Sequence, residues 1–157
     1  MTYFVLSTSP YVTNGIQILP PLRESSKRAN FIPLFLSRVQ AGFPFPTDEY
    51  CEGKIDLNEY LLLHKASTFF LRVTGDSMTE KGIFPGDMLI VDRSLAPSYG
   101  RLVVALFNGE ISVKRIEKLN NRILLCSEND CYPDIKVSNK DNFSIWGVVT
   151  NVIHPLT

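Results

Sequence analysis

The sequence has few cysteines and no net charge, and each of these features excludes a class of protein. Three cysteines among 157 residues are too few, and odd in number, for a disulfide framework, so we expect free thiols and a cytoplasmic location. Lysine and arginine together number 16, as do aspartate and glutamate, which gives a formal net charge of zero. Such a chain does not hold nucleic acid by phosphate neutralisation alone.

The sequence also lacks a long apolar run and any spacing typical of metal ligands. Cys126, Cys131, His64 and His154 form neither a Cys-x-x-Cys pair nor a histidine pair at ligand spacing, so we expect no metal. Residues 1–22 carry no charge, but prolines and polar residues interrupt them. They therefore predict neither a membrane span nor a signal peptide.

Apolar residues and prolines set the expected architecture of the chain. Apolar residues make up 45% of the sequence, which is enough for the core of one domain. Six of the ten prolines fall within residues 1–47, at a spacing that forbids long helices. We therefore expect an extended N-terminal arm, without a helix-turn-helix head and without direct sequence-specific binding to DNA.

After the arm, the pattern predicts one short helix and then a β-rich region. Asp56 and Glu59 resemble a capping box, and apolar spacing predicts a helix over Leu57–His64. The following apolar and β-branched runs are separated by Gly, Pro, Asn and Asp. The predicted strands are Phe69–Val73, Met88–Val91, Leu102–Phe107, Ile111–Ile116, Ile123–Cys126 and Trp146–Ile153. The expected fold is mainly β, a strongly bent antiparallel sheet or partly open barrel.

One hairpin carries a lysine in an unusual place. Asn108-Gly109 favours a two-residue type I′ turn, and counting outward from it pairs Val103 with Lys114. Alternation then puts Lys114 on a largely apolar face, beside Val103 and Ala105. Burial there would lower the lysine pKa from about 10.4 and make the neutral amine a base. The hairpin alone leaves open that Lys114 reaches out to water instead.

A serine turn follows the first predicted strand of the β-rich region. The turn is Gly75-Asp76-Ser77-Met78. Glycine allows a tight turn, and adjacent N–H groups in it can point together at an oxyanion. A serine in such a turn is also common as a purely structural hydrogen-bonding group, so the turn alone assigns no function.

Taken together and in order, four motifs resemble the LexA-like self-cleaving serine peptidases, over residues 68–153. They are Gly75-Asp76-Ser77-Met78, Gly86-Asp87 with Leu89-Ile90-Val91-Asp92, Gly109-Glu110 with Val113-Lys114-Arg115, and Trp146-Gly147-Val148-Val149. Within this family the N-terminal part resembles the UmuD-like proteins of SOS mutagenesis. The segments that carry this likeness are Ile32-Pro33-Leu34-Phe35, Val39-Gln40-Ala41-Gly42-Phe43-Pro44 and Ile55-Asp56-Leu57-Asn58. Residues 1–28 are longer than that pattern needs.

The resemblance implies a Ser-Lys dyad and no cofactor. Ser77 matches the nucleophile and Lys114 the general base. Ala41-Gly42 matches the scissile bond. With Ser77 as the nucleophile, the backbone N–H groups of Ser77 and Met78 in its turn would hold the oxyanion. The implied parts are an arm removed by self-cleavage (residues 1–41), a linker with the short helix (42–66) and a β-rich peptidase domain (67–157).

The resemblance also implies partners. A RecA filament on single-stranded DNA would stimulate cleavage, and the shortened homodimer would act with a UmuC-type error-prone DNA polymerase in translesion synthesis. Two alternatives stay open: a self-cleaving LexA-type repressor that lacks its DNA-binding head, and a non-catalytic polymerase subunit with a vestigial dyad. A signal peptidase also uses serine and lysine, but it would need a membrane segment.

Overall fold

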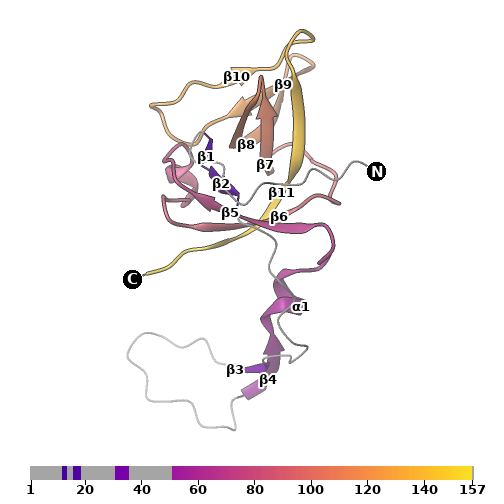
Figure 1. Cartoon of the computed structure of the whole chain (residues 1–157), viewed down its shortest axis with the longest axis vertical. Helices are drawn as coiled ribbons and strands as arrows, with labels where there is room; N and C mark the ends of the chain where they lie inside the picture. The colour runs from indigo at the N-terminus through magenta and orange to yellow at the C-terminus, as the bar shows by residue number, and fades with distance from the viewer. Residues whose placement is uncertain (1–11, 14–15, 19–30, 36–50, 157) are drawn as a thin grey trace. The chain divides into compact units, whose positions relative to one another are not determined.

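The computed structural model describes residues 12–13, 16–18, 31–35 and 51–156, with side chains from residue 53 onward (Figure 1). The chain divides into two compact units. One unit comprises residues 22–63, and the other comprises residues 1–21 together with 64–157.

The smaller unit contains one strand pair and the helix. Its elements are β3 (Phe31–Phe35), β4 (Cys51–Asp56) and α1 (Leu57–Leu61), and β3 pairs with β4 in antiparallel fashion. Asp56 caps α1 by accepting a hydrogen bond from the Asn58 amide at 2.8 Å, as the capping pattern predicts. The helix ends earlier than predicted because Leu62 leaves the helical region, with φ −113° and ψ 70°. No residue of α1 is buried, so packing does not favour a longer helix.

The larger unit is built around one antiparallel sheet (Figure 1). Its strands are β1 (Val12–Thr13), β2 (Ile16–Ile18), β5 (Thr68–Val73), β6 (Met88–Asp92), β7 (Leu102–Phe107), β8 (Glu110–Leu119), β9 (Arg122–Cys126), β10 (Ile135–Lys136) and β11 (Phe143–Ile153). They lie in the order β1-β2-β5-β6-β11-β7-β8-β9-β10, so the sheet does not close on itself. A short 3-10 helix, η2 (Thr79–Lys81), follows the serine turn. The predicted mainly β, antiparallel fold is confirmed.

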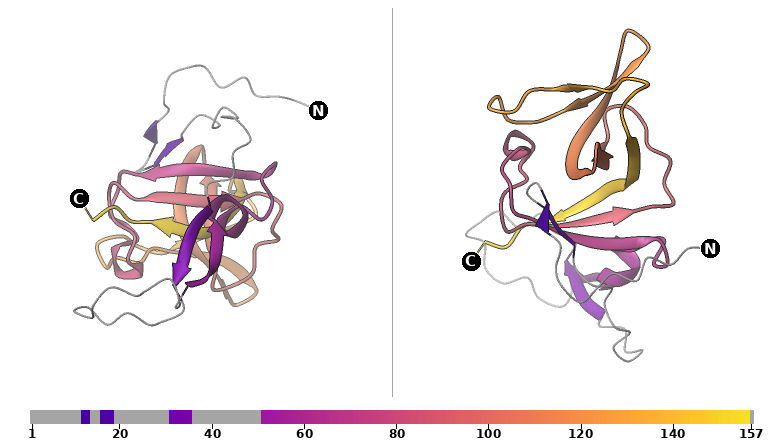
Figure 2. Two further views of the ribbon diagram at one scale, coloured as in Figure 1. Left: turned by 90° about the horizontal axis from the view of Figure 1, so that it is seen from below. Right: turned by 45° about the horizontal axis from the view of Figure 1, so that its top comes forward.

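The long strand β11 joins the two halves of this sheet. It pairs with β6 on one side and with β7 on the other, and its register shifts once against each neighbour. Such irregularities bend a strand and increase its twist. Figure 2 shows the result: the sheet turns between the part formed by β5 and β6 and the part formed by β7, β8 and β9.

The hairpin of β7 and β8 has the register predicted from its turn. Asn108 and Gly109 have φ values of 49° and 90°, and a type I′ turn requires positive φ at both positions. Val103 lies opposite Lys114, as counted from the turn. The strand β8 continues beyond its predicted end and pairs with β9.

Two apolar clusters form the core, and alternation along β7 and β11 assigns residues to one or the other. Val103 and Val148 belong to one cluster, whereas their neighbours Val104 and Val149 belong to the other. The first cluster also contains Ala105, Ile116 and Leu125. The second also contains Leu71, Val73, Met78, Ile83, Leu89, Val91 and Val113.

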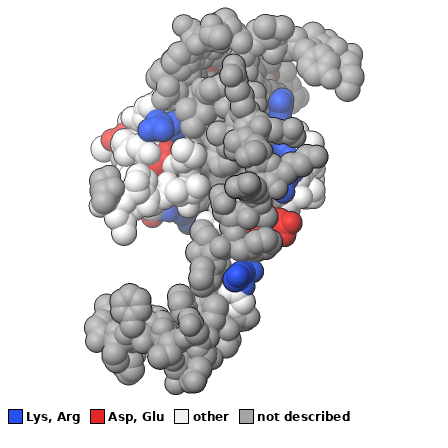
Figure 3. Space-filling model, turned by 60° about the horizontal axis from the view of Figure 1, so that its bottom comes forward, with Lys and Arg blue, Asp and Glu red and all other residues white. Residues whose placement is uncertain are grey.

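The described surface carries charges of both signs. On the face drawn in Figure 3, basic and acidic groups are interspersed among uncharged ones, without an extended field of one sign over the described residues. This agrees with the formal net charge of zero. None of the described helices is long and apolar enough to cross a membrane.

Gly147 on β11 tests the packing at the bend of the sheet. A Cβ atom at this position would lie 2.7 Å from Cγ1 of Val91 and 3.0 Å from the backbone oxygen of Asp92. We therefore expect Gly147→Ala to lower the free energy of unfolding by about 1–3 kcal/mol, measured by urea denaturation. Ser144→Ala, at an exposed position of the same strand, should change it by less than about 0.5 kcal/mol. A Gly147→Ala protein as stable as the wild type would contradict this packing.

Candidate active site

A pocket of about 400 Å³ lies beside the serine turn and the β7–β8 hairpin. Its lining residues are Gly75, Asp76, Ser77, Glu110, Ser112, Lys114, Tyr132 and Ile135. The pocket brings together Ser77 and Lys114, the two residues of the predicted dyad, which are far apart in the sequence. Both carry side chains that can take part in acyl transfer.

Backbone contacts close the loop that contains the serine turn. The Val73 amide donates to the Asp87 oxygen, and the Gly86 amide donates to the Val73 oxygen, both at 2.8 Å. These bonds join the end of β5 to the turn before β6. The side chain of Met78 is buried in the core, with 3% of its surface exposed, whereas its neighbour Ser77 is half-buried. Met78 thus anchors the turn while Ser77 lines the pocket.

The backbone N–H groups of Ser77 and Met78 are predicted to form the oxyanion hole. Among the described residues, neither of them donates a hydrogen bond. The carbonyl groups on the other side of these peptides are occupied. The Asp76 oxygen accepts from Nδ2 of Asn129 at 2.9 Å, and the Ser77 oxygen accepts from the Glu128 amide at 2.8 Å. Because a trans peptide directs its N–H opposite to its C=O, both amides point away from the segment that holds the carbonyls. Two such donors suit an oxyanion.

Lys114 is buried, with 7% of its surface exposed. Its Nζ donates a hydrogen bond to Oγ of Ser127 at 2.8 Å and lies 5.9 Å from the ring centroid of Tyr132. Burial lowers the pKa of Lys114 below its ordinary value, although the negative charge of Asp134 opposes this effect. The hairpin therefore carries an amine that loses its proton more readily than an exposed lysine.

Three residues around Lys114 were not predicted from the sequence: Ser127, Tyr132 and Asp134. They follow β9 in an irregular segment, where no period fixes the direction of a side chain. The sequence signal that could have pointed to them is the polar run directly after Cys126, because it ends an apolar strand. The predicted scissile bond, Ala41-Gly42, lies outside the described residues.

Comparison with known proteins matches residues 33–150 to the Peptidase S24-like family. The chain belongs to this family. Protein ImpA of Salmonella typhimurium is 45% identical over 122 residues, which cover 78% of this chain and 83% of ImpA. Protein MucA of Escherichia coli is 40% identical over 134 residues, 83% of this chain and 91% of MucA. The LexA repressor of Alteromonas mediterranea is 35% identical over 150 residues, 95% of this chain and 71% of the repressor. The predicted UmuD-like, LexA-like relationship is confirmed.

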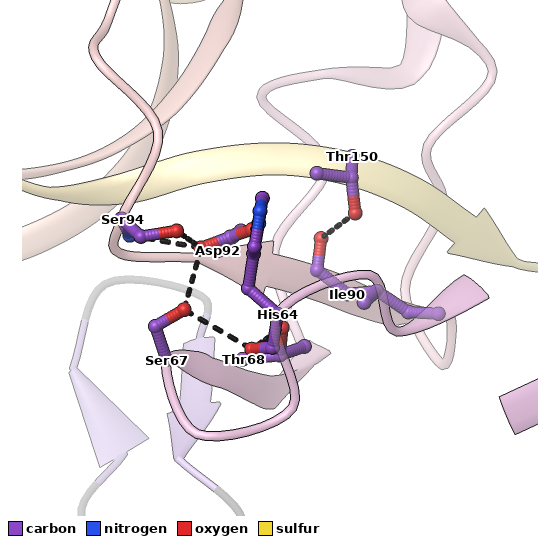
Figure 4. Close-up of polar contacts among 7 residues, drawn as sticks. All are labelled: His64, Ser67, Thr68, Ile90, Asp92, Ser94 and Thr150. Carbon is purple, nitrogen blue, oxygen red and sulfur yellow. Dashed lines mark hydrogen bonds and ion pairs between the residues drawn. The ribbon is translucent and has the colours of Figure 1, made fainter. Parts of the chain in front are cut away.

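This S24-like chain has a second polar cluster, around the buried Asp92 at the end of β6 (Figure 4). Asp92 accepts hydrogen bonds from Nδ1 of His64 at 2.6 Å, Oγ of Ser67 at 2.9 Å, and the amide and Oγ of Ser94 at 2.8 and 2.7 Å. In a Ser-His-Asp triad the serine bonds to the imidazole, but here both serines donate to the carboxylate. The cluster therefore holds the segment before β5 against the end of β6.

In the described part of this S24-like chain, the histidine, cysteine and acidic side chains form no metal site, and the cysteines form no disulfide. There, no three His, Cys, Asp or Glu side chains lie where they could share a metal ion. Cys126 and Cys131 are free thiols, the first buried and the second exposed. Burial raises the pKa of the Cys126 thiol, which keeps it protonated and unreactive.

The Asp92 cluster predicts how the stability of the fold depends on pH. Burial alone would raise the pKa of Asp92, but hydrogen bonds from Ser94, His64 and Ser67 outweigh it and hold the pKa well below its ordinary value. The charged cluster therefore stabilises the fold above the unfolded pKa of about 3.9, and this contribution is lost as the pH falls further.

We expect Asp92→Asn to lower the free energy of unfolding by about 1–3 kcal/mol at neutral pH, because a buried acceptor of several hydrogen bonds loses its charge. The difference from the wild type should shrink below about pH 4, where Asp92 takes up a proton in the unfolded protein while the folded protein still holds the carboxylate charged. Urea denaturation over a pH series measures this. A difference that stays constant down to the most acidic pH would show that the charge of Asp92 does not stabilise the fold.

Proposed function

We propose that this chain is a self-cleaving accessory protein of SOS mutagenesis, in which Ser77 and Lys114 cut the bond between Ala41 and Gly42. The observation that carries the proposal is that Ser77 and the buried Lys114 line one pocket. Membership of the Peptidase S24-like family supports a serine peptidase as the class of enzyme. The likeness to ImpA and MucA supports SOS mutagenesis as the process.

In the first step, neutral Lys114 takes the proton of the Ser77 hydroxyl as its oxygen attacks the carbonyl carbon of Ala41. The carbonyl oxygen of Ala41 becomes an oxyanion in the tetrahedral intermediate. The amides of Ser77 and Met78 donate hydrogen bonds to it, in a site where the protein has already oriented them. A Ser-Lys pair is an established variant of the Ser-His-Asp triad among serine peptidases.

In the second step, the Lys114 ammonium gives its proton to the nitrogen of Gly42, and the bond between Ala41 and Gly42 breaks. An ester joins Ser77 to Ala41. Lys114, neutral again, removes a proton from a water molecule that attacks the ester. Ala41 leaves as a free carboxylate, and the Ser77 hydroxyl regains its proton, so no cofactor is consumed.

A bond cut within the same chain, rather than between the partners of a homodimer, reduces what the pocket must provide. A tethered substrate has an effective concentration of order millimolar when the link is short and flexible. A shallow pocket is then sufficient, because affinity for a free peptide is not needed. Ala41 and Gly42 have little side chain to exclude, and Pro44 favours an extended approach of the backbone.

Regulation and partners follow from the same proposal. A RecA filament on single-stranded DNA would stimulate cleavage by binding the cleavage-competent arrangement more tightly than the others, since only differential affinity shifts such an equilibrium. The shortened homodimer would then act with a UmuC-type error-prone polymerase in the cytoplasm.

A LexA-type repressor is the second candidate, because the Alteromonas mediterranea LexA repressor is 35% identical over 95% of this chain. Such a repressor would bind a specific DNA operator before cleavage and release it afterwards. The six prolines within residues 1–47 oppose a helical DNA-reading head in this part of the chain. Specific retention of a DNA sequence by the intact chain, lost on cleavage, would favour the repressor.

Mass spectrometry of the purified protein with RecA, single-stranded DNA and a nucleotide tests the dyad. The wild type should yield fragments divided after Ala41, and Ser77→Ala and Lys114→Ala should each reduce cleavage by at least about 10³-fold, because each removes a reacting group. Ser144→Ala, which alters an exposed serine on β11, should cleave like the wild type. Equal fragmentation of the Ser77→Ala protein would refute the mechanism, and an intact wild type would indicate a vestigial dyad.

The rate of self-cleavage without RecA should depend on pH through Lys114. Since burial lowers the pKa of this amine, the rate should rise with pH and level off below pH 10.5, the ordinary lysine value. Lys114→Arg should stay inactive throughout, because a guanidinium keeps its proton. A rate midpoint at or above pH 10.5 would contradict a buried, neutral base.

A further inference from the structure

Lys114 has one side-chain hydrogen-bond partner among the described residues, and it is not the serine of the predicted dyad. Its Nζ donates to Oγ of Ser127 at 2.8 Å. Ser127 directly follows β9, the strand that pairs with β8, which carries Lys114. The hydroxyl belongs to a half-buried residue, so it reaches the amine inside the protein rather than across open solvent.

The segment that carries Ser127 is also attached to the serine turn. The Glu128 amide donates to the Ser77 oxygen at 2.8 Å, and the Glu80 amide donates to the Glu128 oxygen at 2.9 Å. The side chain of Asn129 reaches the Asp76 oxygen at 2.9 Å. Three consecutive residues thus contact both halves of the predicted dyad: one holds the amine, and the next two hold the backbone beside Ser77.

The same segment is held to strand β8 by charge. The Glu128 carboxylate accepts a hydrogen bond from Nε of Arg115, the residue after Lys114. Further along, the Tyr132 hydroxyl donates to Oδ1 of Asp76 at 2.5 Å. These contacts attach the segment that carries Ser127 to both β8 and the serine turn.

We propose that Ser127 is a positioning residue for self-cleavage, whose hydroxyl holds the Lys114 amine in place for Ser77. This inference rests on the proposed function and deepens it. A lysine side chain has several rotatable bonds, and even a misplacement of about 1 Å can reduce a rate about 10²-fold. A neutral amine has two N–H groups and one lone pair. When Ser127 accepts a hydrogen bond from one N–H, the amine no longer rotates freely. The lone pair, which must accept the Ser77 proton, is then restricted to fewer directions.

Three other groups near the amine make contacts of a different kind. Asp134 acts on Lys114 by charge and favours the ammonium form, which is the wrong form for a base. Asp76 lines the same pocket, but its carboxylate accepts a hydrogen bond from the Tyr132 hydroxyl. Tyr132 itself offers the amine only the face of its ring, at 5.9 Å. Among the described hydrogen bonds of the Lys114 amine, the acceptor is therefore the Ser127 hydroxyl.

Self-cleavage of Ser127 variants tests the inference in the full-length protein. We expect Ser127→Ala to lower the plateau rate at high pH at least about tenfold, because the amine loses its fixed position. Ser127→Thr, which keeps the hydroxyl, should stay within about threefold of the wild type. This would show that the hydroxyl, and not the size of the side chain, sets the rate. Ser144→Ala serves as the control for removing a serine hydroxyl elsewhere, and thermal unfolding checks that each variant is folded.

A second measurement does not depend on cleavage. In the uncleavable Ser77→Ala background, NMR titration of the Lys114 side chain should give a lower pKa when Ser127→Ala is added, because the ammonium form loses an acceptor. A shift of about half a unit or more corresponds to about a threefold change in the protonation equilibrium. Ser127→Thr should restore the original value.

The outcomes separate this inference from the proposed function. If Ser77→Ala and Lys114→Ala abolish cleavage while Ser127→Ala cleaves at the wild-type rate with an unchanged lysine pKa, Ser127 has no positioning role and the proposed function stands. If Ser127→Thr is as slow as Ser127→Ala, the hydroxyl is not the operative group and the inference is overturned. If the Ser77→Ala protein still cleaves itself, the proposed function fails and this inference fails with it.

Discussion

The proposed chemistry depends on keeping the amine of Lys114 out of water. A lysine in solvent is almost wholly protonated near neutral pH, and each unit by which its pKa falls corresponds to about 1.36 kcal/mol that the fold must supply. The apolar cluster around Val103, Ala105 and Ile116 provides the surroundings that disfavour the charge. Asp134 acts in the opposite direction, so the fraction of neutral amine reflects a balance between burial and one nearby carboxylate.

The curvature of the sheet is the second requirement. Three strands, β6, β11 and β7, separate β5 from β8 in the sheet order. In a flat sheet this would place the two strands about 19 Å apart, since neighbouring strands lie about 4.8 Å apart. Ser77 follows β5 and Lys114 lies on β8, yet both line one pocket. The bend along β11, with Gly147 at the point of closest packing, is therefore part of how the site is built.

The parts of the structure that could be predicted from sequence are those fixed by a local rule. Asn108-Gly109 sets its own turn type, and the turn then sets every pair of the hairpin, including Val103 with Lys114. The capping residue Asp56 likewise marks the start of α1, whereas the end of this helix has no comparable signal. The contacts that were missed join residues distant in sequence through irregular segments. Ser127 reaches Lys114 only because β9 pairs with β8 in one register, and no period or motif encodes such a meeting.

The hydrogen bonds around the pocket bear on what a regulator of cleavage would have to change. The segment after β9 contacts both the Lys114 amine and the backbone beside Ser77, so it links the two residues of the proposed dyad in the folded protein. For the proposed tethered substrate, one variable is how often the arm presents Ala41-Gly42 to the pocket, and a partner that binds this presented state more tightly would increase its population. Under the proposed function, control of self-cleavage can therefore act on the arm without any change in the contacts of Lys114 and the serine turn.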